Sequence, residues 1–392
     1  MDFRFSPEEE AFRDEIRGFL RAELPAGWSD SGGASGFGEA SGDRYEFLRG
    51  FQRKLSAKGW LTLGWPKEHG GMAAGHMMQV IYAEEMSYNR APTQVGVGPD
   101  RVGPTIILAG TDAQRAQHLP GIAGAETVWC QGFSEPGSGS DLASLQTRAV
   151  LDGDYFVVTG QKIWTSLAHK ADWCILLVRT DPDAPKHKGI SYLLMDMRLP
   201  GIEVRPLIDL TGRHTFNEIF MDNVRIPRDC LVGELNQGWY IAAATLDFER
   251  SGINRVVAGS RIYEELVMHC RPTSVATNRP GVAAKLAELG LEFQIGRLLA
   301  YRVASMQARG EVPNAEASLS KVFGSELQQR LADAALNITG LAGQLTAGSA
   351  AAPLGGRLQE YYLSTAGLTI AAGTSEIQRN IIAGRGLGLP RG

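Results

Sequence analysis

One carboxylate interrupts an apolar stripe in the second half of the chain. At steps of three and four residues the stripe contains Leu246, Glu249, Ile253 and Val256. Residues at this spacing share one face of a helix, so Glu249 is expected among apolar neighbours. Burial raises the pKa of a carboxylate, which suits a general base that works near neutral pH. The alternative is a structural glutamate that pairs with Arg250 or another cation at a helix interface.

A second candidate for chemistry is the turn near the C-terminus, which reads I-A-A-G-T-S-E-I-Q-R-N at residues 370–380. Ser375 begins a capping-box spacing, which predicts a helix from Glu376 after a turn at Gly373. The first N–H groups of such a helix are free to face a ligand. Ala372 places no ionisable group in this turn, so a catalytic base must come from another part of the chain.

Glycine and serine are concentrated in the segment Q-G-F-S-E-P-G-S-G-S-D-L-A-S at residues 131–144. Gly137 and Gly139 allow the backbone to approach a phosphate or another polar ligand closely. Ser134, Ser138 and other serines add hydroxyl donors. The alternative interpretation is an ordinary surface loop.

The composition is typical of a globular protein. The chain has 392 residues, of which 44% are hydrophobic and 21% charged, so we expect two or three domains. A formal charge of −4 provides no basic surface for nucleic acid, which is not expected as a partner. The first residues do not resemble a signal peptide, and no run of about 18 apolar residues occurs. We therefore expect a cytoplasmic protein without a membrane span.

The sequence gives no indication of a metal site or a disulfide framework. The seven histidines are scattered without metal-ligand spacing, so no metal is expected. The cysteines form no C-x-x-C pair and are expected to be reduced thiols in or near the core. They are Cys130, Cys174, Cys230 and Cys270.

Hydrophobic periodicity divides the chain into three predicted domains. A helical N-terminal domain is expected over residues 1–125, with Ser6 as the cap of its first helix and a Gly/Ser-rich loop at 29–43. A β-domain is expected over 126–236 and a C-terminal helical bundle over 237–392. The predicted strands are 155–160, 172–178, 189–195 and 216–221, with turns at 152–154 and 222–223. The predicted helices of the bundle are 238–269, 281–308, 315–338 and 375–384.

Five segments occur in an order and spacing that closely resemble the acyl-CoA dehydrogenase family of flavoproteins over almost the whole chain. They are G-T-D-A-Q-R-A-Q-H-L-P-G-I-A-G at 110–124, the Gly/Ser segment at 131–144, G-Q-K-I-W-T-S at 160–166, F-N-E-I-F-M-D-N-V-R-I-P at 216–227 and A-G-T-S-E-I-Q-R-N-I-I-A at 372–383. The resemblance implies a mainly α fold with a central β-domain between an N-terminal helical domain and a C-terminal bundle. It also implies an oxidoreductase of fatty acid metabolism and lipid degradation that uses FAD.

The resemblance assigns a set of FAD-contacting residues by position. Phe133 and Ser134 resemble the pair along the pyrimidine edge of the flavin. Trp164 resembles an aromatic wall, with a plain core residue as its alternative, and Ser166 a hydroxyl donor toward the flavin N5 atom. The full set is Gln131, Phe133, Ser134, Gly139, Ser140, Trp164, Thr165, Ser166, Gly373, Thr374 and Glu376.

The resemblance also relocates the catalytic base. In most members a glutamate occupies the position of Ala372, which here offers only its backbone N–H to the thioester carbonyl. In the branch with isovaleryl and long-chain enzymes, the base lies on the helix after the β-domain, beside an arginine. The segment L-D-F-E-R at 246–250 resembles that arrangement. Glu249 is therefore the expected base, and Arg250 is expected near the CoA ester or, alternatively, paired with Asp247.

The implied reaction converts an acyl-CoA thioester to trans-2-enoyl-CoA, with electrons passed to an electron-transfer flavoprotein. The segment T-Q-V-G-V-G-P-D at 93–100 lies where relatives line the acyl cavity. Gly96 and Gly98 leave space there, so a branched, long or bulky acyl group is expected. Ser140, Arg250, Gly96 and Gly373 are the expected substrate contacts.

Two departures from the family leave the assembly open. The Arg-x-x-Phe element that contacts FAD from a neighbouring subunit is replaced by H-C-R-P at 269–272, and Gln-x-x-Gly-Gly-x-Gly is replaced by N-I-T-G-L-A-G at 337–343. A homo-oligomer, either a tetramer or a dimer, is expected. The alternatives are a non-catalytic or half-catalytic subunit of a heteromer, and an oxygen-using flavoenzyme such as an acyl-CoA oxidase or a monooxygenase.

Overall fold

The chain passes back and forth between two units. The computed structural model describes residues 5–28, 43–93, 95–247, 252–271 and 278–390. One unit consists of Met1–Ala34, Gly75–Ala91 and Arg250–Gly392, and the other of Ser35–Ala74 and Pro92–Glu249. The loop predicted at 29–43 lies, apart from its last residue, outside the described residues. The three domains predicted from the sequence are a different division from these two units, and they remain a prediction.

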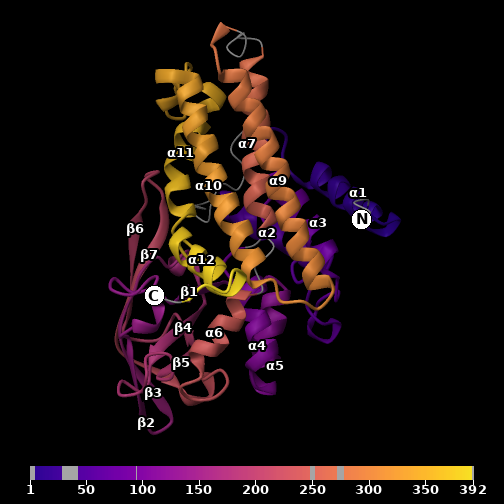
Figure 1. Cartoon of the computed structure of the whole chain (residues 1–392). Helices are drawn as coiled ribbons and strands as arrows, with labels where there is room; N and C mark the ends of the chain where they lie inside the picture. The colour runs from indigo at the N-terminus through magenta and orange to yellow at the C-terminus, as the bar shows by residue number, and fades with distance from the viewer. Residues whose placement is uncertain (1–4, 29–42, 94, 248–251, 272–277, 391–392) are drawn as a thin grey trace. The chain divides into compact units, whose positions relative to one another are not determined.

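All regular elements described in the first unit are helical (Figure 1). The predicted cap of the first helix is confirmed, because the Ser6 hydroxyl accepts from the Glu9 N–H at 3.2 Å and the Glu9 carboxylate accepts from the Ser6 N–H at 2.7 Å. The longer helices of this unit are α1 (Pro7–Glu23), α3 (His76–Tyr88), α7 (Ile253–Cys270), α9 (Val282–Ala308), α10 (Asn314–Thr339), α11 (Arg357–Leu368) and α12 (Ser375–Ile381).

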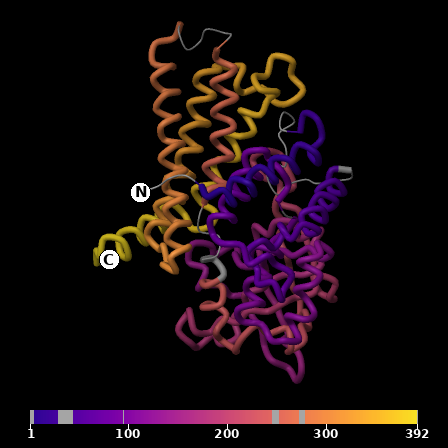
Figure 2. The backbone as a smooth tube through the Cα atoms, turned by 90° about the vertical axis from the view of Figure 1, so that its right-hand side faces the viewer, coloured from indigo at the N-terminus to yellow at the C-terminus, as the bar shows by residue number. Residues whose placement is uncertain are grey.

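The predicted C-terminal helical bundle is confirmed, but the single helix predicted at 238–269 is wrong. The structure has α6 (Gly238–Asp247) in the other unit and α7 in this one, and Gly252 before α7 has a non-helical φ of +69°. Helices α7, α9 and α10 contact one another, and α11 contacts α10. Both views show α7, α9 and α10 side by side with nearly aligned axes (Figures 1 and 2). The helix α11 was missed by the sequence interpretation, because only Leu358 and Thr365 of its twelve residues are buried and the apolar stripe is weak. No helix in the described part of the chain combines the length and the apolar character needed to cross a membrane.

A buried carboxylate joins three helices of the first unit. Glu84 on α3 accepts from Arg13 of α1 at 3.0 Å and from the Tyr301 hydroxyl of α9 at 2.7 Å, and it also pairs with Arg297 of α9. Glu84 is 6% exposed, so these donors replace the water that its charge loses on folding.

The second unit contains a seven-stranded sheet. Its strand order is β1-β4-β2-β3-β7-β6, and β5 pairs with β4. The strands are β1 (Trp129–Gly132), β2 (Arg148–Asp152), β3 (Tyr155–Lys162), β4 (Trp173–Arg179), β5 (Ile190–Asp196), β6 (Ile202–Ile208) and β7 (His214–Pro227). The four predicted strands are confirmed as β3, β4, β5 and β7, and the sequence interpretation missed β1, β2 and β6. Strands β1 and β2 are short, and β2 and β6 are mostly exposed or partly exposed, so these strands carry little apolar signal.

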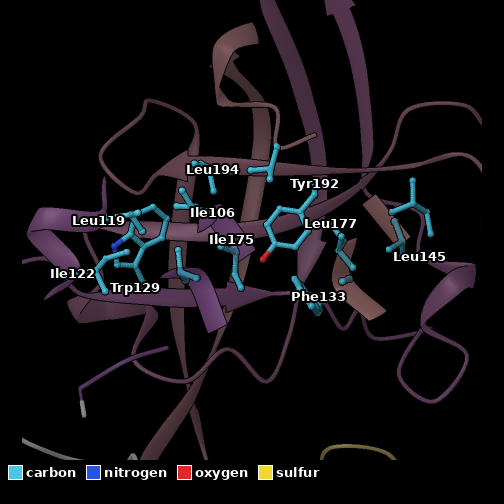
Figure 3. Packing of buried hydrophobic residues seen from close by; sticks show 14 of the residues in the cluster. Ile106, Leu119, Ile122, Trp129, Phe133, Leu145, Ile175, Leu177, Tyr192 and Leu194 are labelled. Carbon is cyan, nitrogen blue, oxygen red and sulfur yellow. The ribbon is translucent and has the colours of Figure 1, made fainter. Parts of the chain in front are cut away.

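Strand β4 is buried on both faces, which explains its continuous apolar sequence. Ile175 and Leu177 belong to a core cluster that also includes Trp129 and Tyr192 (Figure 3). Cys174 and its neighbours on the opposite face belong to a second cluster. The helices of this unit are α2 (Asp43–Ala57), α4 (Gly103–Ala109), α5 (Asp112–Ala123) and α6 (Gly238–Asp247).

One predicted turn is wrong. The D-N pair at 222–223 lies within β7, which continues to Pro227. The two residues Asp222 and Asn223 face the single residue Thr159 of β3, because the register pairs Val158 with Val224 and Gly160 with Met221. Asn223 has φ +50°, so the pair forms a β-bulge within a longer strand. The turn at 152–154 is confirmed, since Asp152 pairs with Tyr155.

The cysteines lie as the prediction of core thiols requires. Cys130, Cys174 and Cys270 are buried and Cys230 is partly buried, all as free thiols. Burial raises the pKa of the Cys230 thiol to about 12, and the charge of Asp229 adds to the shift.

His118 on α5 is a buried neutral histidine between two tryptophans. Its ring lies edge-on to Trp129 at 5.2 Å and to Trp173 at 4.7 Å, and burial lowers its pKa to about 4. Between pH 6.5, its ordinary value, and pH 4, the unfolded chain binds a proton that the folded chain excludes. Stability is therefore present above the ordinary pKa and falls as the pH decreases through this window.

We expect His118→Phe to remove this pH dependence. The wild type is expected to lose about 3 kcal/mol more than the variant between pH 6.5 and pH 4, measured by urea unfolding at several pH values. Equal losses in both proteins would contradict a neutral buried His118. Other groups that titrate in this range are present in both proteins, so their effect on the free energy of unfolding cancels when the variant is compared with the wild type.

Candidate functional site

The Gly/Ser segment is anchored by a fully buried lysine. Lys162 at the end of β3 donates to the Glu135 carboxylate at 2.8 Å and to the Phe133 carbonyl at 3.1 Å. The same carboxylate accepts the N–H groups of Gln146 at 2.6 Å and Thr147 at 2.8 Å. One ion pair thus fixes both ends of the loop that joins β1 to β2.

The protonation of this pair follows from its burial. Lys162 is 0% exposed, and desolvation lowers its pKa to about 8 although Glu135 opposes the shift. Burial raises the pKa of Glu135, but the charge and hydrogen bond of Lys162 outweigh it, and the net pKa lies below the ordinary value. Near neutral pH the pair is therefore ionic.

Within the loop, the serines have different roles. The Ser138 hydroxyl donates to the carbonyls of Asp141 at 3.0 Å and Leu142 at 3.2 Å, so it holds the loop and is not a free donor. Ser140 is exposed, and a methyl group added at Gly137 or Gly139 would meet no atom within 4 Å. The fold itself therefore has no steric need for these two glycines, in keeping with a loop that a ligand approaches.

Phe133 and Gln131 are held by the β-sheet unit. Phe133 is 3% exposed and its ring lies edge-on to Tyr192 at 5.9 Å, so the ring packs in the core and is not available to a ligand. The Ser134 carbonyl accepts from the Ile163 N–H at 2.9 Å. The Gln131 amide oxygen accepts from Arg101 at 3.0 Å.

The segment at 164–166 exposes a tryptophan. The Trp164 side chain is 55% exposed and lies edge-on to Phe216 at 5.7 Å, so the alternative of a plain core aromatic is wrong. Thr165 is fully buried, and its hydroxyl has no hydrogen-bond partner within the described ranges. Ser166 is partly exposed.

These features fit the flavin that the sequence implies. An exposed indole provides a planar surface, the unsatisfied Thr165 hydroxyl is a spare polar group, and the loop around Gly137 and Gly139 is open to a ligand. The fit concerns the β-sheet unit alone, and the individual contacts remain predictions.

We expect Trp164→Ala to weaken FAD binding by about fivefold, because a stacked aromatic contact contributes about 1 kcal/mol beyond burial. The stability of the FAD-free protein should change by less than about 0.5 kcal/mol, because the side chain is exposed. Flavin fluorescence titration and thermal melting measure the two effects. Tyr155→Ala, at an exposed aromatic of the same unit, serves as the control. Unchanged FAD affinity would contradict the assignment.

The C-terminal turn differs from its prediction by one residue. Thr374, not Ser375, is the cap of α12, because its hydroxyl accepts from the Ile377 N–H at 3.3 Å, and the helix begins at Ser375. Since Thr and Ser both cap helices well, the sequence alone could not separate adjacent candidates. Ser375 is instead buried, and its hydroxyl has no partner among the described residues.

The backbone of this turn is unusual. Ala372 has φ +54°, a conformation rare for a residue with a side chain, and its carbonyl accepts from the Gln378 amide at 3.1 Å. Gly373 has φ +82°, and a Cβ there would collide with Gln378. Glu376 is exposed, and hydrogen bonds from its own backbone and from Thr374 lower its pKa.

Gly96 has a structural reason to be glycine. Its φ is +81°, and a Cβ would collide with the Trp129 carbonyl. The expectation that Gly96 leaves space for substrate is therefore not needed to explain the residue, and its place in an acyl cavity remains a prediction. Glu249 and Arg250 lie outside the described residues, so their roles also remain predictions.

The two segments that depart from the family lie close together in the helical unit. His269 and Cys270 at the end of α7, with Ile338 and Thr339 at the end of α10, line a cavity of about 390 Å³. Arg279 donates to the carbonyl of Ile338 at 2.6 Å and thereby caps α10.

The sequence interpretation missed Lys162, Glu135 and Asn217. Asn217 is fully buried on β7, and it binds the backbone of Thr165. A buried lysine in a strand is a signal that could have revealed Lys162, because such a charge needs a partner. An asparagine in an apolar strand gives a weaker signal of the same kind.

Comparison with known proteins supplies the family. The family descriptions "Acyl-CoA dehydrogenase" N-terminal, middle and C-terminal domain match residues 6–126, 130–224 and 236–387. The acyl-CoA dehydrogenase IpdE1 of Mycobacterium tuberculosis is 38% identical over 97% of this chain and 98% of its own.

Two solved structures are similar over the full length. The Tcur3481-Tcur3483 steroid ACAD has a TM-score of 0.91 at 34% identity and covers 100% of both chains. The ChsE4-ChsE5 complex from Mycobacterium tuberculosis has a TM-score of 0.88 at 33% identity, again over 100% of both chains. The fold class expected from the sequence is thereby confirmed. The chain belongs to the acyl-CoA dehydrogenase family of FAD-dependent oxidoreductases.

Proposed function

We propose that the chain catalyses the α,β-dehydrogenation of a bulky acyl-CoA thioester, with Glu249 as the base. Two positions in the sequence support this assignment. Ala372 leaves the C-terminal turn without a carboxylate, while L-D-F-E-R at 246–250 supplies one beside an arginine. The reaction removes a proton from the α-carbon and a hydride from the β-carbon, giving trans-2-enoyl-CoA. Bound FAD supplies the two-electron acceptor for that hydride.

Proton removal, flavin binding and substrate binding are assigned to different residues of this chain. Glu249 takes the α-proton, whose acidity rises when the thioester carbonyl accepts a hydrogen bond. The backbone N–H of Ala372 is the proposed donor to that carbonyl, because backbone donors are preorganised and need no side chain. Trp164 and Ser166 hold and orient the flavin, and Ser140, Arg250, Gly96 and Gly373 contact the substrate. Electrons then leave for an electron-transfer flavoprotein.

We propose a branched or ring-bearing acyl group as the substrate. Relocation of the base accompanies branched, long or bulky acyl chains in the family that the sequence resembles. The name of the Tcur3481-Tcur3483 relative, a steroid ACAD, supports a ring-bearing substrate.

The second candidate is a subunit of a heteromeric acyl-CoA dehydrogenase. Two observations favour it over a homotetramer: the replaced family elements at 269–272 and 337–343, and two similar structures whose names each join two different proteins. In that assembly a different chain would supply FAD contacts that this chain lacks.

An anaerobic titration distinguishes these functions. Purified protein is mixed with linear, branched and ring-bearing acyl-CoAs, and loss of the oxidised-flavin absorbance is followed. Loss with a ring-bearing or branched acyl-CoA supports the proposal. A colourless protein that gains FAD only with a partner chain supports the heteromer, and reduction only by short linear substrates would overturn the bulky-substrate assignment. Peroxide formed in equal amount to product in air would identify an oxygen-using enzyme.

A further inference from the structure

The segment that carries Trp164 is held in an unfavourable backbone conformation. Trp164 and Leu167 both have φ +59°, in the left-handed region that residues with side chains seldom occupy. Such residues persist where their surroundings fix the backbone, and they are concentrated at binding sites. The structure therefore needs an element that holds this turn in place.

Asn217 provides that element. Its backbone N–H donates to the Thr165 carbonyl at 2.9 Å, and the Thr165 N–H donates to the Asn217 carbonyl at 3.0 Å. Its side-chain amide donates to the same Thr165 carbonyl at 3.0 Å. Three hydrogen bonds from one fully buried residue thus fix the residue between Trp164 and Ser166.

The other end of the Asn217 side chain contacts two histidines. Its amide oxygen lies 3.2 Å from His169 Nδ1 and 2.7 Å from His214 Nε2. The two imidazole rings are stacked, with centroids 4.1 Å apart and planes at 25°. The histidines come from different elements, since His169 lies in the turn Ala168–Lys170 after the tryptophan segment and His214 begins β7.

The hydrogen-bond pattern fixes the direction of every donor. A carbonyl only accepts, so the Asn217 NH₂ group must face Thr165 and its oxygen must face the histidines. That oxygen also only accepts, so His169 carries its proton on Nδ1 and His214 carries one on Nε2. The amide is thus locked between two N–H donors and one carbonyl, and it cannot rotate without losing all three bonds.

We propose that Asn217 is a positioning residue for the flavin site: its amide, locked by His169 and His214, sets the backbone of Thr165 and thereby the direction of Trp164 and Ser166. The proposal rests on the proposed role of Trp164–Ser166 in holding the flavin. It adds a specific mechanism, in which residues without contact to the flavin determine how the indole is presented to it.

The test uses a substitution that removes only the side-chain bonds. Asn217→Leu has a similar size and keeps both backbone hydrogen bonds to Thr165. We expect it to weaken FAD binding by about tenfold, the value of one hydrogen bond, and to shift the visible circular dichroism of bound flavin in the direction of Trp164→Ala. His187→Leu, an exposed histidine of the same unit, is the matched control. FAD affinity and a flavin spectrum equal to those of the control would overturn the proposal.

A second pair of variants decides the question if Asn217→Leu fails to fold. His214→Gln keeps an N–H donor that can reach the Asn217 oxygen, whereas His214→Leu does not. We expect His214→Leu to weaken FAD binding and increase hydrogen exchange in the 163–168 peptide of the FAD-free protein, and His214→Gln to restore both toward wild type. Wild-type behaviour of His214→Leu would overturn the proposal. A different result would be unchanged FAD binding in Trp164→Ala together with increased hydrogen exchange of the 163–168 peptide in His214→Leu. It would show that Asn217 positions the segment but that the segment does not bind the flavin, and the proposal would be wrong for that reason.

Discussion

Glu249→Gln is expected to lower kcat by about a thousandfold, with FAD content and acyl-CoA binding close to wild type. A general base contributes about 10²–10⁴ to rate, and glutamine has the shape of the glutamate without its capacity to accept the proton. Stopped-flow measurement of anaerobic flavin reduction gives the rate of the chemical step, and the substrate-induced shift of the flavin spectrum gives binding. The two measurements separate a lost base from a lost site.

Asp247→Asn provides the matched control, because it removes a neighbouring carboxylate two residues away. It should reduce the flavin at a rate within about threefold of wild type, as expected for a carboxylate with no part in proton removal. Equal rates for wild type and Glu249→Gln would show that the base is a different residue. A variant that fails to bind substrate would favour the structural interpretation, in which Glu249 pairs with Arg250.

Lys162→Met is expected to lower the free energy of unfolding by about 3–5 kcal/mol, because it leaves the Glu135 carboxylate buried without its cation. The Phe133 carbonyl also loses its donor, which had reached it at 3.1 Å. Urea unfolding of the FAD-free protein measures the effect. Since Glu135 fixes both ends of the loop, FAD binding should weaken in parallel.

A surface pair of the same type and length offers the control. Lys186 contacts Asp141 at 2.8 Å, the same distance as Lys162 to Glu135, but its side chain is 52% exposed. Lys186→Met should therefore cost less than about 1 kcal/mol. The double variant Lys162→Met with Glu135→Gln should recover part of the loss, because no charge remains buried. Equal effects at Lys162 and Lys186 would contradict the role of burial.

The sequence predicted those elements whose pattern is strong. Strand β4 has an uninterrupted apolar run because both of its faces are buried, and α1 combines a capping box with an apolar stripe. The strand β6 and the helix α11 were missed because each buries few of its side chains. The D-N pair at 222–223 was taken for a turn because these residues favour turns and bulges alike, and only the register with β3 distinguishes the two.

The sequence predicted those parts of the candidate site that residue types alone indicate. It did not predict the parts that depend on contacts between residues far apart in the chain. Trp164 and Ala372 were identified from the sequence, but their residue types do not indicate the positive φ angles that both adopt. Asn217 lies 52 residues from Thr165, and Lys162 lies 27 from Glu135, so neither partnership has a local pattern. The cap of α12 could be either of two adjacent hydroxyl residues, Thr374 or Ser375, and only the structure shows that Thr374 accepts the backbone N–H while Ser375 is buried.

The contacts of Glu84 have a consequence for how the protein is made. Its partner Arg13 is synthesised early, but its partner Arg297 lies 213 residues further along the chain. At about 5–20 residues per second, the ribosome needs about 10–40 s to supply that second cation. During this interval α1 and α3 have been synthesised but lack α7 and α9, which pack against α3, while the strands of the sheet unit are being synthesised. The apolar face of α3 therefore stays exposed until α7 and α9 have been synthesised, which is the condition under which unfinished chains aggregate.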